Sequence, residues 1–176
     1  GSSVSVSTDG QIVAIGAAHN AENGLNSGHV RIYSWNGSTW NQLGADIDGE
    51  AAGDFSGRTV SLSSDGQTVA IGAPQNNGNG GDSGHVRIYS WDGSVWNQLG
   101  ADIVGEAAGD QLGFSVSLAA DGYSVAIGAN YNDGNGSNSG HVRIYSWDGS
   151  AWNQLGADID GESPEDRSGI SVSLST

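Results

Sequence analysis

The sequence predicts an all-β fold made of three tandem units, and three observations lead to this prediction. The segment Gly28–Trp35 recurs without change at Gly84–Trp91 and at Gly140–Trp147, which sets a period of 56 residues. Short segments of each unit alternate small polar with apolar residues, the two-residue period of a β-strand. No segment shows the apolar spacing of an amphipathic helix. One repeated β-unit therefore accounts for the chain.

Each unit is expected to contain four short strands. In the second unit they fall at Thr59–Ser63, Thr68–Ala73, His85–Trp91 and Val95–Leu99. Asp65-Gly66 and Asp92-Gly93 separate the outer pairs, and Asp-Gly favours the positive φ angles of a tight hairpin turn. A longer Asn- and Gly-rich loop, Pro74–Ser83, joins the second strand to the third. The unit is thus an antiparallel meander.

A repeat of this length with four antiparallel strands has the size of a β-propeller blade. We expect one repeat array over residues 1–176. It comprises blade 1 at about 3–58, blade 2 at about 59–114, blade 3 at about 115–170, and an extra strand at 171–176. The extra strand repeats the first strand of a unit, so the chain starts and stops within the same element.

Three blades do not close a propeller, which needs about 4 to 8. The open sides would expose apolar surface, so the ring is expected to be completed by oligomerisation, most simply as a six-bladed homodimer. The residues expected at this closure are Val4, Val6, Ile170, Val172 and Leu174. Of the two terminal strand copies we expect the C-terminal one to dock, because it keeps its preceding turn, residues 166–169.

The motifs, taken in order, resemble FG-GAP repeats, the blades of integrin α-subunit-type propellers. The resemblance rests on Gly113–Ser117, Val125–Ala129 and Gly140–Tyr145, and the second unit also contains Gly72-Ala73-Pro74. It implies an extracellular or cell-surface location and calcium held in the first hairpin of a blade. Here that hairpin turn is only Asp-Gly, as in Asp121-Gly122, which offers too few oxygen ligands for calcium.

The charge balance excludes several kinds of partner. Twenty acidic residues face five arginines, for a formal net charge of −15. Nucleic acids and anionic membrane surfaces need positive protein surface, so neither is expected. No apolar run approaches the ~20 residues that span a bilayer, so no membrane insertion is expected. With no cysteine, neither disulfides nor thiolate metal sites can form.

Most acidic residues fall in the long loops, which all lie on one face of the disc. The ligand-binding candidates on this face are Asp46, Asp48, Glu50, Asp102, Glu106, Asp158, Asp160, Glu162, Asn132 and Asp133. They could bind a glycan or a basic protein, or Ca²⁺ in a lectin- or adhesin-like domain. Asp82 and Asp133 are the metal candidates, but neither belongs to a complete ligand set. Alternatively, the acidic loops only keep the protein soluble.

Three sets of side chains recur at equivalent positions of the units. His29, His85 and His141 begin the third strand and are expected to cap it, a metal ring or pH switch being the alternative. The arginines two residues later are expected in ion pairs between blades or stacked on aromatic rings. The tryptophan pairs, such as Trp91 and Trp96, are expected to pack around the outer hairpin, and sugar-stacking platforms are the other interpretation.

No residue that breaks the repeat completes a set of nucleophile, base and orienting group, and no cofactor is expected. The sequence therefore predicts a non-enzymatic propeller scaffold or interaction module. The alternative is a calcium-dependent carbohydrate- or protein-binding propeller that uses its acidic face.

Overall fold

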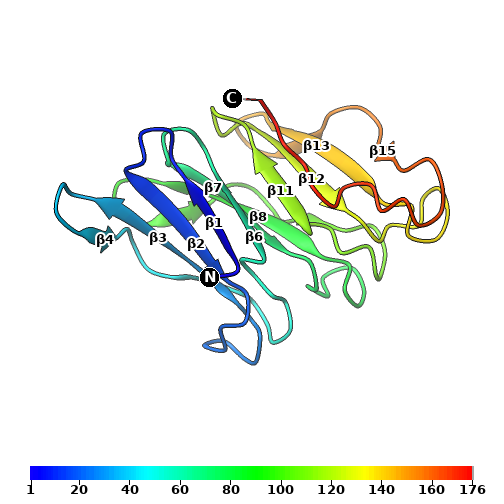
Figure 1. The fold of residues 1–176 in the computed structure, drawn as a ribbon, viewed down its shortest axis with the longest axis horizontal. Coiled ribbons are helices and arrows are strands. Elements are labelled where there is room, and N and C mark those ends of the chain that lie inside the picture. The colour runs from blue at the N-terminus through cyan, green and yellow to red at the C-terminus, as the bar shows by residue number, and fades with distance from the viewer. Residues whose placement is uncertain (176) are drawn as a thin grey trace.

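The computed structural model describes residues 1–175, which form three antiparallel β-sheets and contain no helix. The first sheet contains β1 (Ser3–Val6), β2 (Ile12–Ala17), β3 (His29–Trp35), β4 (Trp40–Gln42) and β5 (Ile47–Asp48). The second contains β6 (Thr59–Leu62), β7 (Thr68–Ala73), β8 (His85–Trp91), β9 (Trp96–Gln98) and β10 (Ile103–Val104). The third contains β11 (Ser115–Leu118), β12 (Ser124–Ala129), β13 (His141–Trp147), β14 (Trp152–Gln154) and β15 (Ile159–Asp160). Figure 1 shows them side by side in chain order, and each lies inside one expected blade.

The first hairpin of each blade forms where the Asp-Gly turn was expected. In the second blade, β6 pairs with β7 in a register that places Val60 opposite Ile71. The Asp65 carboxylate accepts hydrogen bonds from the Ser63 hydroxyl at 2.6 Å and from the Gln67 amide at 2.9 Å. These two contacts fix the turn, because they satisfy polar groups that the tight loop leaves without strand partners.

The fourth strand of each blade is split into two pieces, which the sequence analysis did not predict. In the second blade, β9 pairs with one half of β8 and β10 with the other half. Gly100, with φ of 71°, bends the chain between them. The Leu99 amide still donates to the Ile88 carbonyl at 2.7 Å, so the break begins only after Leu99.

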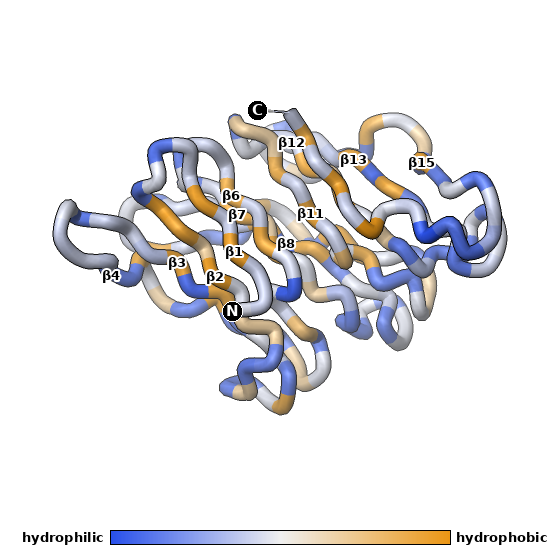
Figure 2. The backbone as a smooth tube through the Cα atoms, in the orientation of Figure 1, coloured by the Kyte–Doolittle hydropathy of each residue, from blue (hydrophilic) through white to orange (hydrophobic). Residues whose placement is uncertain are grey.

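The core lies between blades rather than inside one. Ile47 of the first sheet is buried with Val60, Leu62, Val69 and Ile71 of the second. The equivalent Ile103 of the second sheet is buried with residues of the third. Figure 2 accordingly shows apolar colour along the strands and hydrophilic colour in the loops. Each blade therefore buries its flank only against the next one.

Polar contacts fix the same junctions. The hydroxyls of Ser3, Thr59 and Ser115 donate to the carbonyls of Gly57, Gly113 and Gly169, each 54 residues along the chain. Gly72 lies so close to the Gly113 carbonyl that a Cβ atom would overlap with it. Glycine is therefore required there for close approach of two backbones.

The C-terminal segment differs from the expected strand. Residues 171–175 pair with no strand, and Thr176 lies outside the described residues. The Leu174 amide donates to the Ser117 hydroxyl at 3.0 Å, as Leu118 does to Ser61 at the preceding junction. The segment thus lies against the third blade as β11 lies against the second, and it pairs with no strand of the described residues. Figure 1 shows it in red near β11 and β12.

Which terminal copy docks in an assembly stays a prediction, because the structure is that of a single chain. The N-terminal copy, β1, pairs with β2 over all four of its residues.

Within residues 1–175 no helix is long and apolar enough to cross a membrane.

Candidate functional site

The acidic candidates of the long-loop face gather at the blade junctions. In each blade a carboxylate between the two pieces of the fourth strand lies beside the histidine that begins the third strand. These pairs are Asp46 with His29, Asp102 with His85, and Asp158 with His141, at 3.4 to 3.5 Å from carboxylate oxygen to Nδ1. A glutamate of the preceding blade joins the second and third clusters, Glu50 and Glu106 respectively.

At the junction of the first and second blades, Arg87 links the two sheets. Its Nη1 lies 3.7 Å from the Glu50 carboxylate, and its Nη2 donates to the Asp48 carbonyl at 2.7 Å. The guanidinium also lies over the Tyr89 ring, 5.7 Å from its centre. This side chain is buried, so its charge is balanced mainly by the neighbouring blade.

At the next junction Arg143 forms the same link with better geometry. Its Nε and Nη2 donate to the two oxygens of Asp158 at 2.9 and 2.7 Å, and Nη2 also contacts Glu106 of the second blade. Burial alone would lower the pKa of Arg143, but the hydrogen bonds to Asp158 and Glu106 raise it above its ordinary value. The pKa of Asp158 is lowered, mainly by its hydrogen bond with Arg143. The sequence-based expectation of ion pairs between blades agrees with these contacts.

The histidines are buried and face carboxylates. Burial first, and then the neighbouring arginine charge, lower the pKa of His85 and of His141 below the ordinary value. Neither Nδ1 nor Nε2 of His141 has a hydrogen-bond partner among the described residues. The expected capping of a loop carbonyl is therefore not seen for His141.

The histidine clusters bring together the donor types of a metal site, but an arginine occupies the same space. In the first blade, Nε and Nη2 of Arg31 both lie 2.8 Å from the Asp46 oxygen that faces His29. A divalent cation would have to share that oxygen with a guanidinium. Calcium also prefers an all-oxygen shell, which imidazole does not offer. The donor set thus fits an ion-pair network better than a metal.

The other loop candidates shape the loops themselves. Asn132 accepts from the Gly134 amide at 2.8 Å and donates to the buried Asp110 at 3.1 Å, and Asp133 accepts from the Asn138 amide at 2.8 Å. Asp82, the other metal candidate, has φ of 54° in the equivalent loop of the second blade. Asp160 lies 4.0 Å from His141 Nδ1, and Glu162 is exposed at the open side of the third blade.

The two open sides of the array expose apolar residues that are buried at internal junctions. Ile159 is 55% exposed, whereas the equivalent Ile47 and Ile103 are 7% and 6% exposed. Among the expected closure residues, Val4 and Ile170 are exposed to similar extents, 65% and 54%. Val6 is exposed as well, and Val172 and Leu174 are half-buried.

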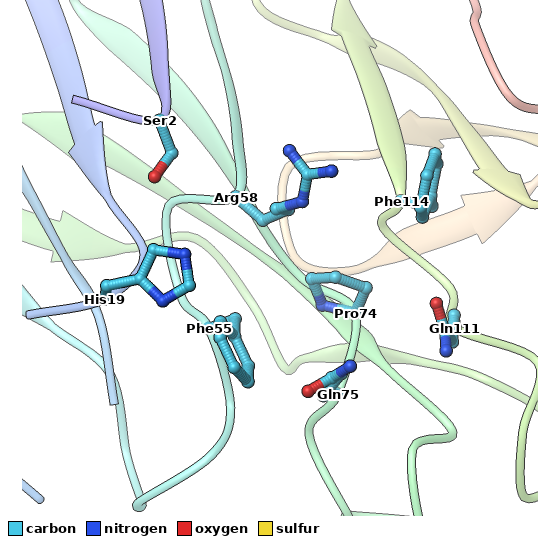
Figure 3. A pocket seen from close by; sticks show the side chains of 8 residues that line it. All are labelled: Ser2, His19, Phe55, Arg58, Pro74, Gln75, Gln111 and Phe114. Atoms are coloured by element: carbon cyan, nitrogen blue, oxygen red, sulfur yellow. The ribbon is translucent and has the colours of Figure 1, made fainter. Parts of the chain in front are cut away.

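A further hollow, of about 410 Å³, was not predicted from the sequence. It lies where the loops before β6 and β11 approach the ends of β2 and β7 (Figure 3). Phe55, Arg58 and Phe114 line it together with Gln75. The signal that would have found it is the comparison of the units with each other, because these positions differ in all three.

Several solved structures have folds similar to that of this chain. A putative 6-phosphogluconolactonase from Bacteroides uniformis matches with a TM-score of 0.59 and 14% identity, over 89% of this chain and 40% of that one. Hydrazine synthase of Kuenenia stuttgartiensis matches with a TM-score of 0.56 and 15% identity, over 86% and 41%. The periplasmic gluconolactonase of Pseudomonas aeruginosa matches with a TM-score of 0.51 and 18% identity, over 93% and 40%.

At these identities the likeness shows the fold alone, a propeller-like arrangement of antiparallel sheets. The chain spans about two fifths of the length of these structures. No curated protein matches the chain. Residues 105–145, from the end of the second blade into β13, match the FG-GAP repeat family. The resemblance drawn from the sequence is thus confirmed for this stretch.

Proposed function

We propose that this chain is a non-enzymatic propeller scaffold that binds a second copy of itself and so completes a six-bladed ring. The observation that carries the proposal is a socket on the open side of the first blade, a hollow of about 310 Å³ lined by Val13, Ile15, Tyr33 and Trp40. The equivalent residues of the second blade include Val69, Ile71 and Tyr89, which pack with the incoming Ile47.

The opposite end of the chain carries the matching group. Ile159 is equivalent to Ile47 and Ile103, but no blade follows it in this chain. Placing Ile159 of one copy in the socket of another repeats a contact that the chain already makes twice. Full burial of such a side chain stabilises by about 1.5 to 3 kcal/mol.

The charges at the two ends are complementary in the same way. Arg87 and Arg143 have side chains only 7% exposed and each meets a glutamate of the preceding blade. Arg31 has no preceding blade, and its side chain is 42% exposed. Glu162, the equivalent of Glu50 and Glu106, is exposed at the other end. Head-to-tail contact would bring Glu162 of one copy to Arg31 of the next.

Light scattering in solution tests the proposal. We expect twice the 17.8 kDa of one chain for the native protein. Ile159→Glu should reduce the mass to that of one chain, because it places a charge in the apolar socket. Val95→Glu is the matched control, since Val95 is equally exposed but lies in an outer hairpin turn. A native mass of one chain would overturn the proposal.

The overlapping terminal strands define how the ring would close. Both β1 and residues 171–175 occupy the place of a blade's first strand, so one copy must leave when two chains meet. We propose that the C-terminal copy displaces β1 of the partner. Deleting residues 171–176 should then weaken assembly more than deleting residues 1–7, and the reverse order would assign the exchange to β1.

A further inference from the structure

The hollow in Figure 3 is built from only four positions of the 56-residue repeat. Ser2, Arg58 and Phe114 occupy one of them, and Phe55 and Gln111 occupy a second. The other two positions are those of Pro74 and of its neighbour, which is His19 in the first blade and Gln75 in the second. Three of the four positions supply lining residues from more than one unit. Pro74 occupies the fourth position, next to Gln75.

At each of these four positions the three blades carry three different residues. Along the chain the sets are Ala18, Pro74 and Asn130; His19, Gln75 and Tyr131; Phe55, Gln111 and Arg167; and Arg58, Phe114 and Ile170. The blades are otherwise close copies. Complete divergence also occurs elsewhere, at the positions of Ser64, Thr68, Asn77, Gly81 and Val95, but those residues line no part of this hollow.

Exposed positions that belong to a hydrogen-bonded turn stay the same in all three blades. Ser94 and Asn97 donate to Asp92, and Gln98 donates to Asp102. Divergence around the hollow means that its set of lining residues does not recur at the next junction, so the hollow has a chemistry of its own.

Backbone strain occurs at one of these four positions. Phe55, Gln111 and Arg167 have φ of 54°, 55° and 53°, in the left-handed region that glycine adopts without strain. Phe55 and Gln111 line the hollow whereas Arg167 lies outside it, so the strain belongs to this turn in every blade.

The lining has the chemistry of an anion site with flat apolar walls. Arg58 lies over the Phe114 ring, 5.6 Å from its centre. The rings of His19 and Phe55 are perpendicular, and their centres lie 5.2 Å apart. Arg58 is exposed and forms no ion pair with the residues that the structure describes. No acidic side chain lines the hollow, although the chain carries a net charge of −15.

We propose that this hollow binds a small molecule in which a carboxylate is attached to a six-membered ring. Arg58 binds the carboxylate, Phe55 and Phe114 contact the faces of the ring, and Gln75 and Gln111 bond to its polar substituents. The volume lies within the range of about 300 to 1,000 Å³ found for small-molecule sites. All lining residues belong to one chain, and only Ser2 adjoins β1, the strand that the proposed exchange would displace. An acidic sugar and an aromatic acid share the required chemistry.

Three probes separate these requirements: galacturonate, benzoate and the neutral sugar galactose. Each is titrated into protein labelled with ¹⁵N, and the shift of the Arg58 Nε–H signal gives the dissociation constant. We expect galacturonate or benzoate to bind at least about tenfold more tightly than galactose, because hydrogen bonds between Arg58 and a carboxylate are about twice as strong as those between neutral groups. The acid that binds more tightly identifies the source of the ligand.

Two variants test the role of the residues. Arg58→Gln should weaken binding of the acid to the level of galactose. In this variant the shifts of backbone amide signals report binding, because the Arg58 signal is lost. Phe114→Ala should weaken the binding of galacturonate and of galactose to the same extent. Arg167→Gln is the matched control, because Arg167 pairs with Glu165 and lies over Tyr131, outside the hollow. Thermal unfolding checks that each variant folds.

Three outcomes would overturn the proposal. The first is that neither acid shifts the Arg58 Nε–H signal at up to about 10 mM. The second is that galactose and galacturonate bind equally well while benzoate does not bind. The third is that Arg58→Gln binds the acid as tightly as the unchanged protein does.

Discussion

The indole Nε1 of Trp152 donates a hydrogen bond to the carbonyl of Leu99 at 3.0 Å, across the junction of the second and third blades. Trp96 makes the same bond to Leu43 at 2.8 Å one junction earlier. The other tryptophan of the pair, Trp147, lies 5.5 Å from Trp152 between ring centres. This geometry agrees with the expected packing of each pair around its hairpin. Trp96 and Trp152 in addition join two blades.

Replacing Trp152 by Phe should therefore destabilise the chain more than replacing Trp147. The first change leaves the Leu99 carbonyl without its partner, which costs about 1 kcal/mol. The second removes no hydrogen bond of the ring nitrogen within residues 1–175. Urea unfolding of Trp152→Phe and Trp147→Phe compares the two directly, and equal losses would refute the role of this bond.

Close backbone approach makes a second prediction at Gly72. A methyl group there overlaps with the Gly113 carbonyl of the next blade, so Gly72→Ala should lower the free energy of unfolding by roughly 1–3 kcal/mol. Gly81 has open space around its Cα and no positive φ. Gly81→Ala should be neutral or stabilise by up to about 1 kcal/mol, because alanine restricts the unfolded chain. Similar losses for both variants would contradict this assignment.

Asp148 gives a prediction about acid stability. The amides of Ala151 and Ser150 and the Ser150 hydroxyl donate to its carboxylate, which lowers its pKa to about 2. Its contribution to stability is present above the unfolded pKa near 4 and is lost as the pH falls through about 2.

Asp148→Asn provides the comparison, because Asn36 forms the same turn in the first blade. The difference in melting temperature between wild type and Asp148→Asn should be greatest above pH 5, shrink as the pH falls toward 2, and vanish below it. A constant difference across this range would show that the carboxylate charge plays no part.

His141 should also make stability fall as the pH decreases, but at higher pH than Asp148 does. Burial and the Arg143 charge lower its pKa below the ordinary value of 6.5, so the unfolded chain binds the proton more readily than the folded one. Stability should therefore fall as the pH drops below about 6.5. His141→Gln should flatten this part of the stability curve, measured by urea unfolding between pH 5 and pH 8, and an unchanged slope would exclude His141 as its source.

The fold follows from short-range signals, and most of the site does not. Alternation in Thr59–Leu62 and the Asp65-Gly66 turn fix a hairpin locally, so they are visible in the sequence. The link between Arg87 and Glu50 depends on how adjacent blades approach, and only the structure shows that geometry. The sequence does contain a signal for the hollow, because Phe55, Gln111 and Arg167 occupy the same repeat position and all differ.

The split outer strand bears on how such arrays avoid fibril formation. A long, continuous strand at the rim would present a row of unpaired amides and carbonyls to any neighbouring molecule. Here the rim of the second blade consists of Trp96–Gln98 and Ile103–Val104, with a bend between them at Gly100. Neither piece is long enough to act as a template for a foreign strand. Copies of the unit can therefore be added along the array without creating an edge that recruits other chains.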